Sequence, residues 1–274
     1  MSSFAGQESA EAAAWPYYAG SILPHDETEP STGTGSWWEL EDGTFNLRSK
    51  TYLDNKVKEP SAPAGFATIS VTVIDSVGML TELGKRLIPL RDFLAKEEGE
   101  FIVINRAVPV GGGRVQNIII VGKRVLCVGE DPVFDRTWDR YKKGDDEYRN
   151  LRMKYLPKLR VAPWLVTSAI DLLGGQRPVI MGKGYLKQNN YSGDNWVEFD
   201  IDIASSKIAN SIAGTIMGYC SSLVINEAFV VEGKEEDELP ERMLIQHEFR
   251  KVDTGTASRP LKEGDYVRAE EEEK

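Results

Sequence analysis

The segment Trp196–Gly233 constrains the fold more than any other part of the chain, because it places two strand patterns and one helical pattern close together. Apolar and polar residues alternate over 196–203, which predicts a strand with one buried face and one solvent face. The run Leu223–Val231 is almost continuously apolar and rich in β-branched residues, which predicts a strand buried on both faces.

A helix is predicted between these two strands. Isoleucines recur at four-residue spacing at 208, 212 and 216, and a parallel row of small or apolar residues widens this apolar face. Ser205 or Ser206 offers an N-cap. Gly214 and Gly218 lower helix propensity, so we expect them to allow close contact with a strand or a ligand. The same face could belong to a tightly packed core helix or to the wall of an apolar cavity.

The rest of the chain adds mostly strands. β-prone runs at 66–77, 100–108 and 114–128 predict three strands, the last two joined by a hairpin turn at the triple glycine 111–113. Helical patterns cover 81–98, divided at Pro89, and 133–159, broken at Gly144. These elements predict one α+β domain with a curved, mainly antiparallel sheet packed around helices, for which a START-like helix-grip is one possible form. The predicted domain spans 37–252, between a disordered segment at 1–36 and an acidic, frayed tail at 253–274.

Composition narrows the classes of partner and location. The net charge of −10 disfavours nucleic-acid binding. Cys127 and Cys220 lie far apart in apolar contexts, which favours buried free thiols in a reducing compartment. The sequence shows no signal peptide, transit peptide or transmembrane run, so we expect a cytoplasmic protein.

Few residues are suited to catalysis or metal binding. The chain has only two histidines, His25 and His247, so we expect no catalytic triad or dyad, no metal site and no cofactor. Asp200 and Asp202 share one face of the first strand, where two carboxylates could bind a divalent cation or exchange protons. We expect that face to be solvated, and we predict a protein without enzymatic activity.

The segment 144–154 allows two interpretations. Arg149 and Arg152 lie three residues apart on one helical face, and Asp145 stands four residues before Arg149. They could form an internal salt-bridge network that fixes the helix to the sheet. Alternatively, Arg149 or Arg152 could bind an anionic head group, with Trp164 nearby where an amphipathic ligand passes from polar to apolar surroundings.

Four blocks resemble the C-terminal domain of the plant protein "enhanced disease resistance 2". They are Trp38 with DGTFNLRSKTYL, GDDEYRNLRMKYLPKL with Pro163-Trp164, YSGDNWVEFDIDIASSKIANSIAGTIMGY, and SLVINEAFVVEGKEEDELPERML. In the plant proteins this domain follows phosphoinositide-binding PH and lipid-binding START domains, so the resemblance implies a link to lipids. It implies no catalytic motif, and targeting through the PH and START modules is not carried over to this chain.

Together these observations lead to the hypothesis of a non-catalytic domain that encloses a lipid or another hydrophobic molecule, with a peripheral location at membranes as a further expectation. Arg149, Arg152 and Trp164 are predicted near the mouth of the cavity, and the predicted walls are Phe199, Ile201, Ile212, Ile216, Met217 and Phe229. The alternative is a protein-interaction or scaffold domain with a packed core, which would use the basic 136–160 region and the acidic ends of the chain.

Overall fold

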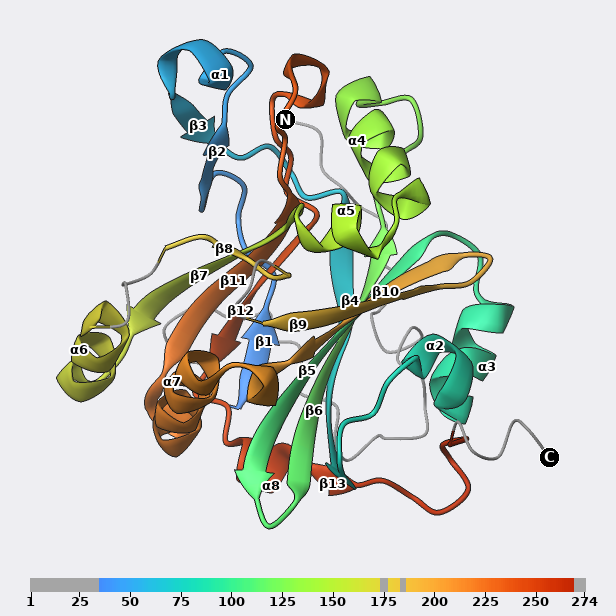
Figure 1. Cartoon of the computed structure of the whole chain (residues 1–274), viewed down its shortest axis with the longest axis vertical. Coiled ribbons are helices and arrows are strands. Elements are labelled where there is room, and N and C mark those ends of the chain that lie inside the picture. The colour runs from blue at the N-terminus through green and yellow to red at the C-terminus, as the bar shows by residue number, and fades with distance from the viewer. Residues whose placement is uncertain (1–34, 173–176, 183–185, 269–274) are drawn as a thin grey trace, which may run out of the picture.

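A computed structural model describes residues 35–172, 177–182 and 186–268 of the chain. Its larger sheet has six strands in the order β13-β4-β6-β5-β10-β9 (Figure 1). The neighbours pair antiparallel except β10 with β5 and β13 with β4, which pair parallel. Its strands are β4 (Phe66–Val77), β5 (Phe101–Gly111), β6 (Arg114–Arg124), β9 (Lys187–Ser192), β10 (Trp196–Asp202) and β13 (Arg259–Pro260).

A second sheet of five strands has the order β1-β12-β11-β7-β8 and is antiparallel throughout. A separate hairpin consists of β2 (Asn46–Arg48) and β3 (Lys58–Pro60). The five strands are β1 (Ser36–Trp38), β7 (Met153–Val161), β8 (Val179–Ile180), β11 (Val224–Val231) and β12 (Ile245–Arg250).

The helices surround these sheets. α4 and α5 lie at one end of the molecule, whereas α7 and α8 lie toward the other (Figure 1). The α-helices are α1 (Tyr52–Asn55), α2 (Leu83–Arg86), α3 (Ile88–Lys96), α4 (Pro132–Lys143), α5 (Asp146–Asn150), α6 (Trp164–Leu172), α7 (Lys207–Tyr219) and α8 (Thr254–Ala257). The short 3-10 helices are η3 (Ile203–Ser205), η4 (Cys220–Ser222) and η5 (Glu236–Glu238).

The main core lies between the two sheets. Ile104 of β5 and Phe199 of β10 belong to the same buried cluster as Phe229 of β11 and Ile245 of β12. At Gly122 of β6 an added Cβ would lie 2.6 Å from Ile245 Cδ1, so the glycine permits close approach of the sheets. Aromatic residues of α4 close one end of this core, with Trp138 and Tyr141 stacked at 5.5 Å between ring centroids.

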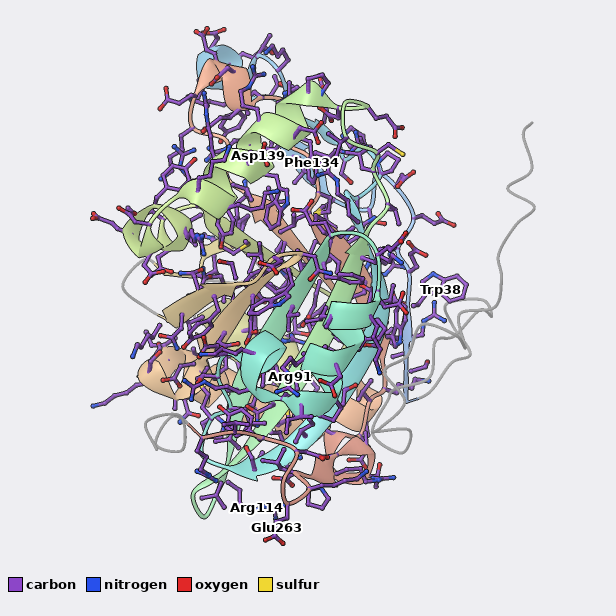
Figure 2. The ribbon with its side chains drawn as sticks, turned by 90° about the vertical axis from the view of Figure 1, so that its right-hand side faces the viewer. Trp38, Arg91, Arg114, Phe134, Asp139 and Glu263 are labelled. Atoms are coloured by element: carbon purple, nitrogen blue, oxygen red, sulfur yellow. The ribbon has the colours of Figure 1, made fainter. Side chains whose placement is uncertain are left out.

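The outer faces of both sheets are covered as well. Leu83 of α2, Leu90 and Leu94 of α3, and Leu87 between them pack against the outer face of the six-stranded sheet. The two helices lie in front of this sheet in Figure 2. Arg91, on α3, is on the outer side of this layer (Figure 2). On the five-stranded sheet, Leu156, Ala228 and Val230 contact a smaller cluster that includes Phe45 and Leu47. Each sheet therefore has two covered faces.

The α+β single domain and its mainly antiparallel sheets confirm the predicted fold class. The protein has two packed sheets instead of one sheet gripping a helix, and a START-like form remains a prediction. The hairpin at 111–113 and the division of 81–98 are confirmed by β5–β6 and by α2–α3. The expectation of helix at 153–159 is wrong: these residues form β7, whose inward residues enter the core between the sheets.

Two predictions about the ends of the domain have different outcomes. The disordered segment predicted at 1–36 lies outside the described residues, except that β1 already begins at Ser36. The predicted frayed tail is wrong for the residues just after 253, which form α8 and then β13 on the edge of the six-stranded sheet. Further on, the hydroxyl of Tyr266 donates to the carbonyl of Thr81 at 2.9 Å.

Candidate functional site

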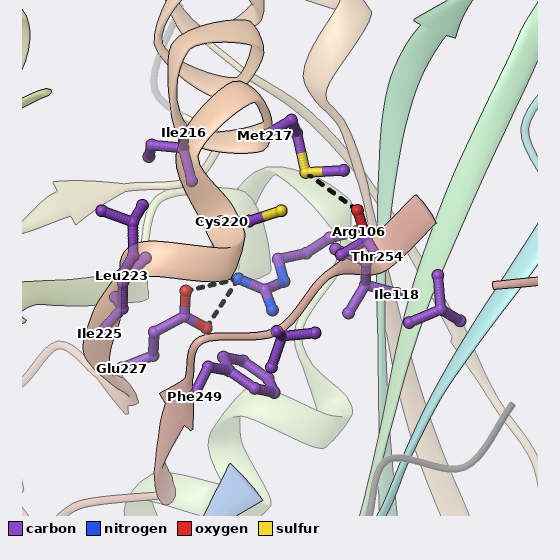
Figure 3. Close-up of a pocket in the computed structure, with 12 residues that line it drawn as sticks. Arg106, Ile118, Ile216, Met217, Cys220, Leu223, Ile225, Glu227, Phe249 and Thr254 are labelled. Carbon is purple, nitrogen blue, oxygen red and sulfur yellow. Dashed lines mark hydrogen bonds and ion pairs between the residues drawn. The ribbon is translucent and has the colours of Figure 1, made fainter. Parts of the chain in front are cut away.

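A cleft of about 80 Å³ lies where the two sheets diverge, and we call it the inter-sheet cleft (Figure 3). One wall is the inner face of the six-stranded sheet and the other is the inner face of the five-stranded sheet. The end of α7, the η4 turn and the start of α8 cover it. The lining residues are Val73, Arg106, Ile118, Ile216, Met217, Cys220, Leu223, Ile225, Glu227, Phe249, Val252 and Thr254.

An ion pair between the two sheets stands in this otherwise apolar cleft. Arg106 extends from β5 and Glu227 from β11, and Arg106 Nη1 donates to both carboxylate oxygens at 2.6 Å (Figure 3). The side chains are 14% and 5% exposed. The Arg106 guanidinium also lies 5.3 Å from the centroid of the Phe249 ring. This pair joins the two sheets inside the cleft.

Two further polar side chains complete the network around Glu227. The hydroxyl of Tyr155 donates to Oε1 at 2.8 Å, and His247 Nε2 lies 3.5 Å from Oε2. On its other side the His247 ring contacts the hydroxyl of Thr68, with Nδ1 and Oγ1 at 3.3 Å. Strand alternation explains the grouping, because Tyr155, Glu227 and His247 all come from the inward face of the five-stranded sheet.

The charges of this network are fixed by its geometry. Burial alone would raise the pKa of Glu227, but the Arg106 charge and the contacts from His247 and Tyr155 outweigh it and lower this pKa to about 2. Burial lowers the pKa of His247 and raises that of Tyr155 well above its ordinary value. At neutral pH the cleft therefore holds one cation and one anion beside two neutral rings, with no net charge.

The helix that covers the cleft is held loosely. Ser206 caps α7 by accepting from the backbone of Ala209 at 3.2 Å, as predicted, yet no residue of α7 is buried. An added Cβ at Gly214 or Gly218 would meet no atom within 4 Å, so the expectation that these glycines allow close contact with a strand is wrong, and contact with a ligand stays a prediction. The cleft does lie beside this helix, but a lipid-sized pocket measures several hundred cubic ångströms.

The predicted wall residues divide between the cleft and the core. Ile216 and Met217 line the inter-sheet cleft. Phe199, Ile201 and Phe229 are fully buried in the main core, where the rings of Phe199 and Phe229 lie 5.5 Å apart. Ile212 is half-buried on α7 and is not among the residues that line the cleft.

The residues predicted near the mouth lie elsewhere. Arg149 is 9% exposed and donates to the backbone carbonyls of Tyr141 and Lys142 at the end of α4. Arg152 donates to the Glu238 carboxylate and to the carbonyl of Glu232, at 3.1 Å for the latter. These contacts correspond to the first of the two interpretations of this segment, an internal network, and not to the binding of an anionic head group. Trp164 is 78% exposed at the start of α6 and lines no part of the cleft.

The expectation of a solvated carboxylate face on β10 is wrong. Asp200 is fully buried, as is Glu198 on the same face, because α2 and the loop before it cover that side of the sheet. Glu198 accepts from the backbone N–H groups of Leu83 and Gly84 at 2.6 and 2.8 Å, and Asp200 accepts from Glu82 at 3.1 Å. The pair therefore anchors the turn into α2.

The protonation of these two neighbouring buried acids is linked. Burial raises the pKa of Glu198, and burial together with the neighbouring Glu198 charge raises the pKa of Asp200 well above its ordinary value. Since Glu198 binds two N–H donors in its charged form, we assign the retained proton to Asp200. Asp202, at the end of the strand, is only half-buried and does not join the pair.

A pH-dependence of stability follows from this proton. An acid whose pKa is raised by folding binds more protons folded than unfolded, so its contribution to stability falls as pH rises above about 4. Asp200→Asn replaces the protonated acid by a neutral group of the same shape, and we expect a shallower loss of stability between pH 5 and pH 9. Urea unfolding at several pH values measures this slope, and Asp92→Asn on the exposed side of α3 is the matched control. An unchanged slope in Asp200→Asn would contradict the assignment.

Sequence reasoning missed the polar part of the cleft. Arg106 and Glu227 each follow an asparagine in a strand whose other residues are mostly apolar, and opposite charges in two such strands are the signal that could have paired them. Cys220 lines the cleft, whereas Cys127 is exposed, so the expectation of two buried thiols is wrong. Among the described residues, no group of three or more His, Cys, Asp or Glu is placed to hold a metal ion.

Comparison with known proteins agrees with the quoted sequence blocks. The family described as "Protein ENHANCED DISEASE RESISTANCE 2, C-terminal" matches residues 37–253. A curated relative from Arabidopsis thaliana, "Protein ENHANCED DISEASE RESISTANCE 2-like", is 29% identical over 245 residues, which cover 89% of this chain and 32% of the relative. The match thus spans about a third of that relative's length. No solved structure matches the chain. The family match covers well over half of the sequence, and the chain belongs to the ENHANCED DISEASE RESISTANCE 2 C-terminal family.

Proposed function

We propose that this domain binds a hydrophobic small molecule, without catalysis, in the inter-sheet cleft. The observation that carries the proposal is the lining of the cleft, which is apolar apart from the Arg106–Glu227 pair and Thr254. Ligand pockets are commonly apolar with a few fixed polar groups that orient the ligand. The ionisable groups here are bound to one another, which suits recognition better than proton transfer.

The size of the cleft makes α7 part of the proposal. About 80 Å³ holds only one end of a ligand, so a larger molecule must extend to the surface or displace the cover. α7 suits such movement because none of its residues is buried and it is followed directly by the η4 turn. Segments with few buried contacts open at low free-energy cost. We therefore propose that the ligand enters beneath α7 and η4.

A filled-cleft variant tests this function. Met217→Trp adds volume inside the cleft, and we expect it to weaken binding by about tenfold or more, because overpacked sites exclude further groups. Uptake of the neutral fluorescent hydrophobe N-phenyl-1-naphthylamine is the measurement, alongside organic extraction of the purified protein. Ser211→Trp, on the exposed side of the same helix, is the control and should bind as the parent does.

Two outcomes would count against the proposal. A protein that takes up no hydrophobe and yields none on extraction would favour the scaffold alternative, in which the cleft is a packing irregularity. Equal binding by Met217→Trp and Ser211→Trp would move the ligand away from the cleft.

No helix among residues 35–172, 177–182 and 186–268 has the length and apolar character to cross a membrane. A cytoplasmic location, peripheral contact with membranes and ligand binding by Arg149, Arg152 or Trp164 stay predictions.

A further inference from the structure

The unusual feature of the inter-sheet cleft is a guanidinium that faces its partner with only one nitrogen. Both hydrogen bonds between Arg106 and Glu227 use Nη1, so the edge formed by Nε and Nη2 is turned away from the carboxylate. That edge is the one through which arginine commonly binds a second acceptor. Arg106 Nε is buried and has no hydrogen-bond partner among the described residues.

A buried donor without an acceptor is costly, because it has lost water and gained nothing in exchange. Around this donor the cleft presents mainly apolar side chains, with Ile118 and Thr254 on one side of Arg106 and Ile225 on the other (Figure 3). The hydroxyl of Thr254 is directed toward Met217, where Oγ1 lies 3.9 Å from Sδ. An acceptor brought in by a ligand would therefore gain a charge-assisted hydrogen bond in a site that excludes water.

The charge of the network decides which acceptor fits. Glu227 already neutralises Arg106, and His247 and Tyr155 are neutral, so a second carboxylate or a phosphate would be an uncompensated anion in an apolar site. A carbonyl or hydroxyl oxygen accepts the same hydrogen bond without adding charge. From this geometry we infer that the ligand of the inter-sheet cleft is an uncharged hydrophobic molecule bearing a carbonyl or hydroxyl oxygen, which Arg106 binds through its Nε edge.

This inference rests on the proposed function, and a ligand series separates the two. The probes are n-octane, 2-octanone and sodium octanoate, which share a chain length and differ in the polar end. Binding at pH 7 is followed by methyl NMR of the whole protein, using the signals of Ile216, Met217 and Ile225 in the cleft. We expect 2-octanone to bind at least about tenfold more tightly than octanoate.

A double variant isolates the role of the guanidinium. Arg106→Met with Glu227→Gln removes both charges together, so neither is left unpaired. The double variant should bind 2-octanone about tenfold more weakly, because the hydrogen bond to a charged donor is lost. Its affinity for octane should not change. Glu227→Gln alone leaves Arg106 uncompensated, and we expect it to narrow or reverse the preference for 2-octanone over octanoate.

Each result has a separate meaning. If none of the three probes shifts the cleft signals, the proposed function fails. If octane and 2-octanone bind and the double variant weakens both equally, hydrophobic binding holds but the role of Arg106 is overturned. Tighter binding of octanoate than of 2-octanone to the parent protein would overturn the preference for an uncharged ligand. The first and third readings use the parent protein alone and do not depend on any variant folding.

Discussion

Glu227→Ala is expected to destabilise the protein by about 3–5 kcal/mol, the usual cost of removing one partner of a buried ion pair. The substitution leaves the Arg106 guanidinium between the sheets with no carboxylate, and it also removes the acceptor of the Tyr155 hydroxyl. Equilibrium urea unfolding, followed by far-UV circular dichroism, measures the change in the free energy of unfolding. Because Glu227 is charged down to a pKa of about 2, the stability that it supplies should persist at neutral pH and fall as pH drops below about 4.

A variant that removes both charges is the comparison for this result. Arg106→Met with Glu227→Gln should recover most of the lost stability, since replacing both members of a buried pair is often nearly neutral. Asp92→Asn is the control for a surface pair, because Arg91 and Asp92 are about half exposed at 46% and 50%. It should cost no more than about 1 kcal/mol. A Glu227→Ala variant as stable as Asp92→Asn would show that the inter-sheet pair contributes nothing to folding.

Phe229→Ala is expected to cost about 3–5 kcal/mol, because it empties the centre of the core between the sheets. The ring is fully buried, with the Tyr155 and Phe199 ring centroids 5.2 and 5.5 Å away. Differential scanning calorimetry or urea unfolding measures the loss. The sequence alone assigned Phe229 to the wall of a ligand cavity, and a wall residue facing an open cavity would cost much less on truncation.

Ile208→Ala is the matched control for Phe229→Ala. Ile208 is 48% exposed on α7, so its truncation should change stability by less than about 1 kcal/mol. If Phe229→Ala lost as little stability as Ile208→Ala, the core between the sheets would be only loosely packed around the Phe229 ring. A large loss in Phe229→Ala with unchanged hydrophobe uptake would instead separate the core from the cleft, as the positions of the two predict.

Local patterns were sufficient to predict several elements. Strong alternation and β-branched residues identified β4, and turn chemistry identified the β5–β6 hairpin, because both depend on neighbours in sequence. The same alternation correctly placed Phe199 and Ile201 on one face of β10 and Asp200 on the other. It could not show that α2 would cover the second face, since that contact joins residues 82–84 to residues 198–200.

The candidate site was harder to predict for the same reason. Its central pair joins residues 106 and 227, which are 121 positions apart, and no spacing rule links them. Arg149 and Arg152 looked suited to an anion because they form a basic pair, but their partners are backbone carbonyls and Glu238 from other elements. Of the predicted wall residues, Ile216 and Met217 line the cleft, because the apolar face of their helix is the side turned toward the sheets.

The strand order of the five-stranded sheet has a consequence for synthesis on the ribosome. β4, β5 and β6 are neighbours in space and are complete once residue 124 has been made. In contrast, β1 lies beside β12, with Trp37 opposite Phe249, and β7 lies beside β11. In the five-stranded sheet, β1 and β7 must therefore wait for β12 and β11, which are made later. We expect β4, β5 and β6 to pair during translation, whereas β7 must wait for β11 until residue 231, and β1 for β12 until residue 250, has left the exit tunnel.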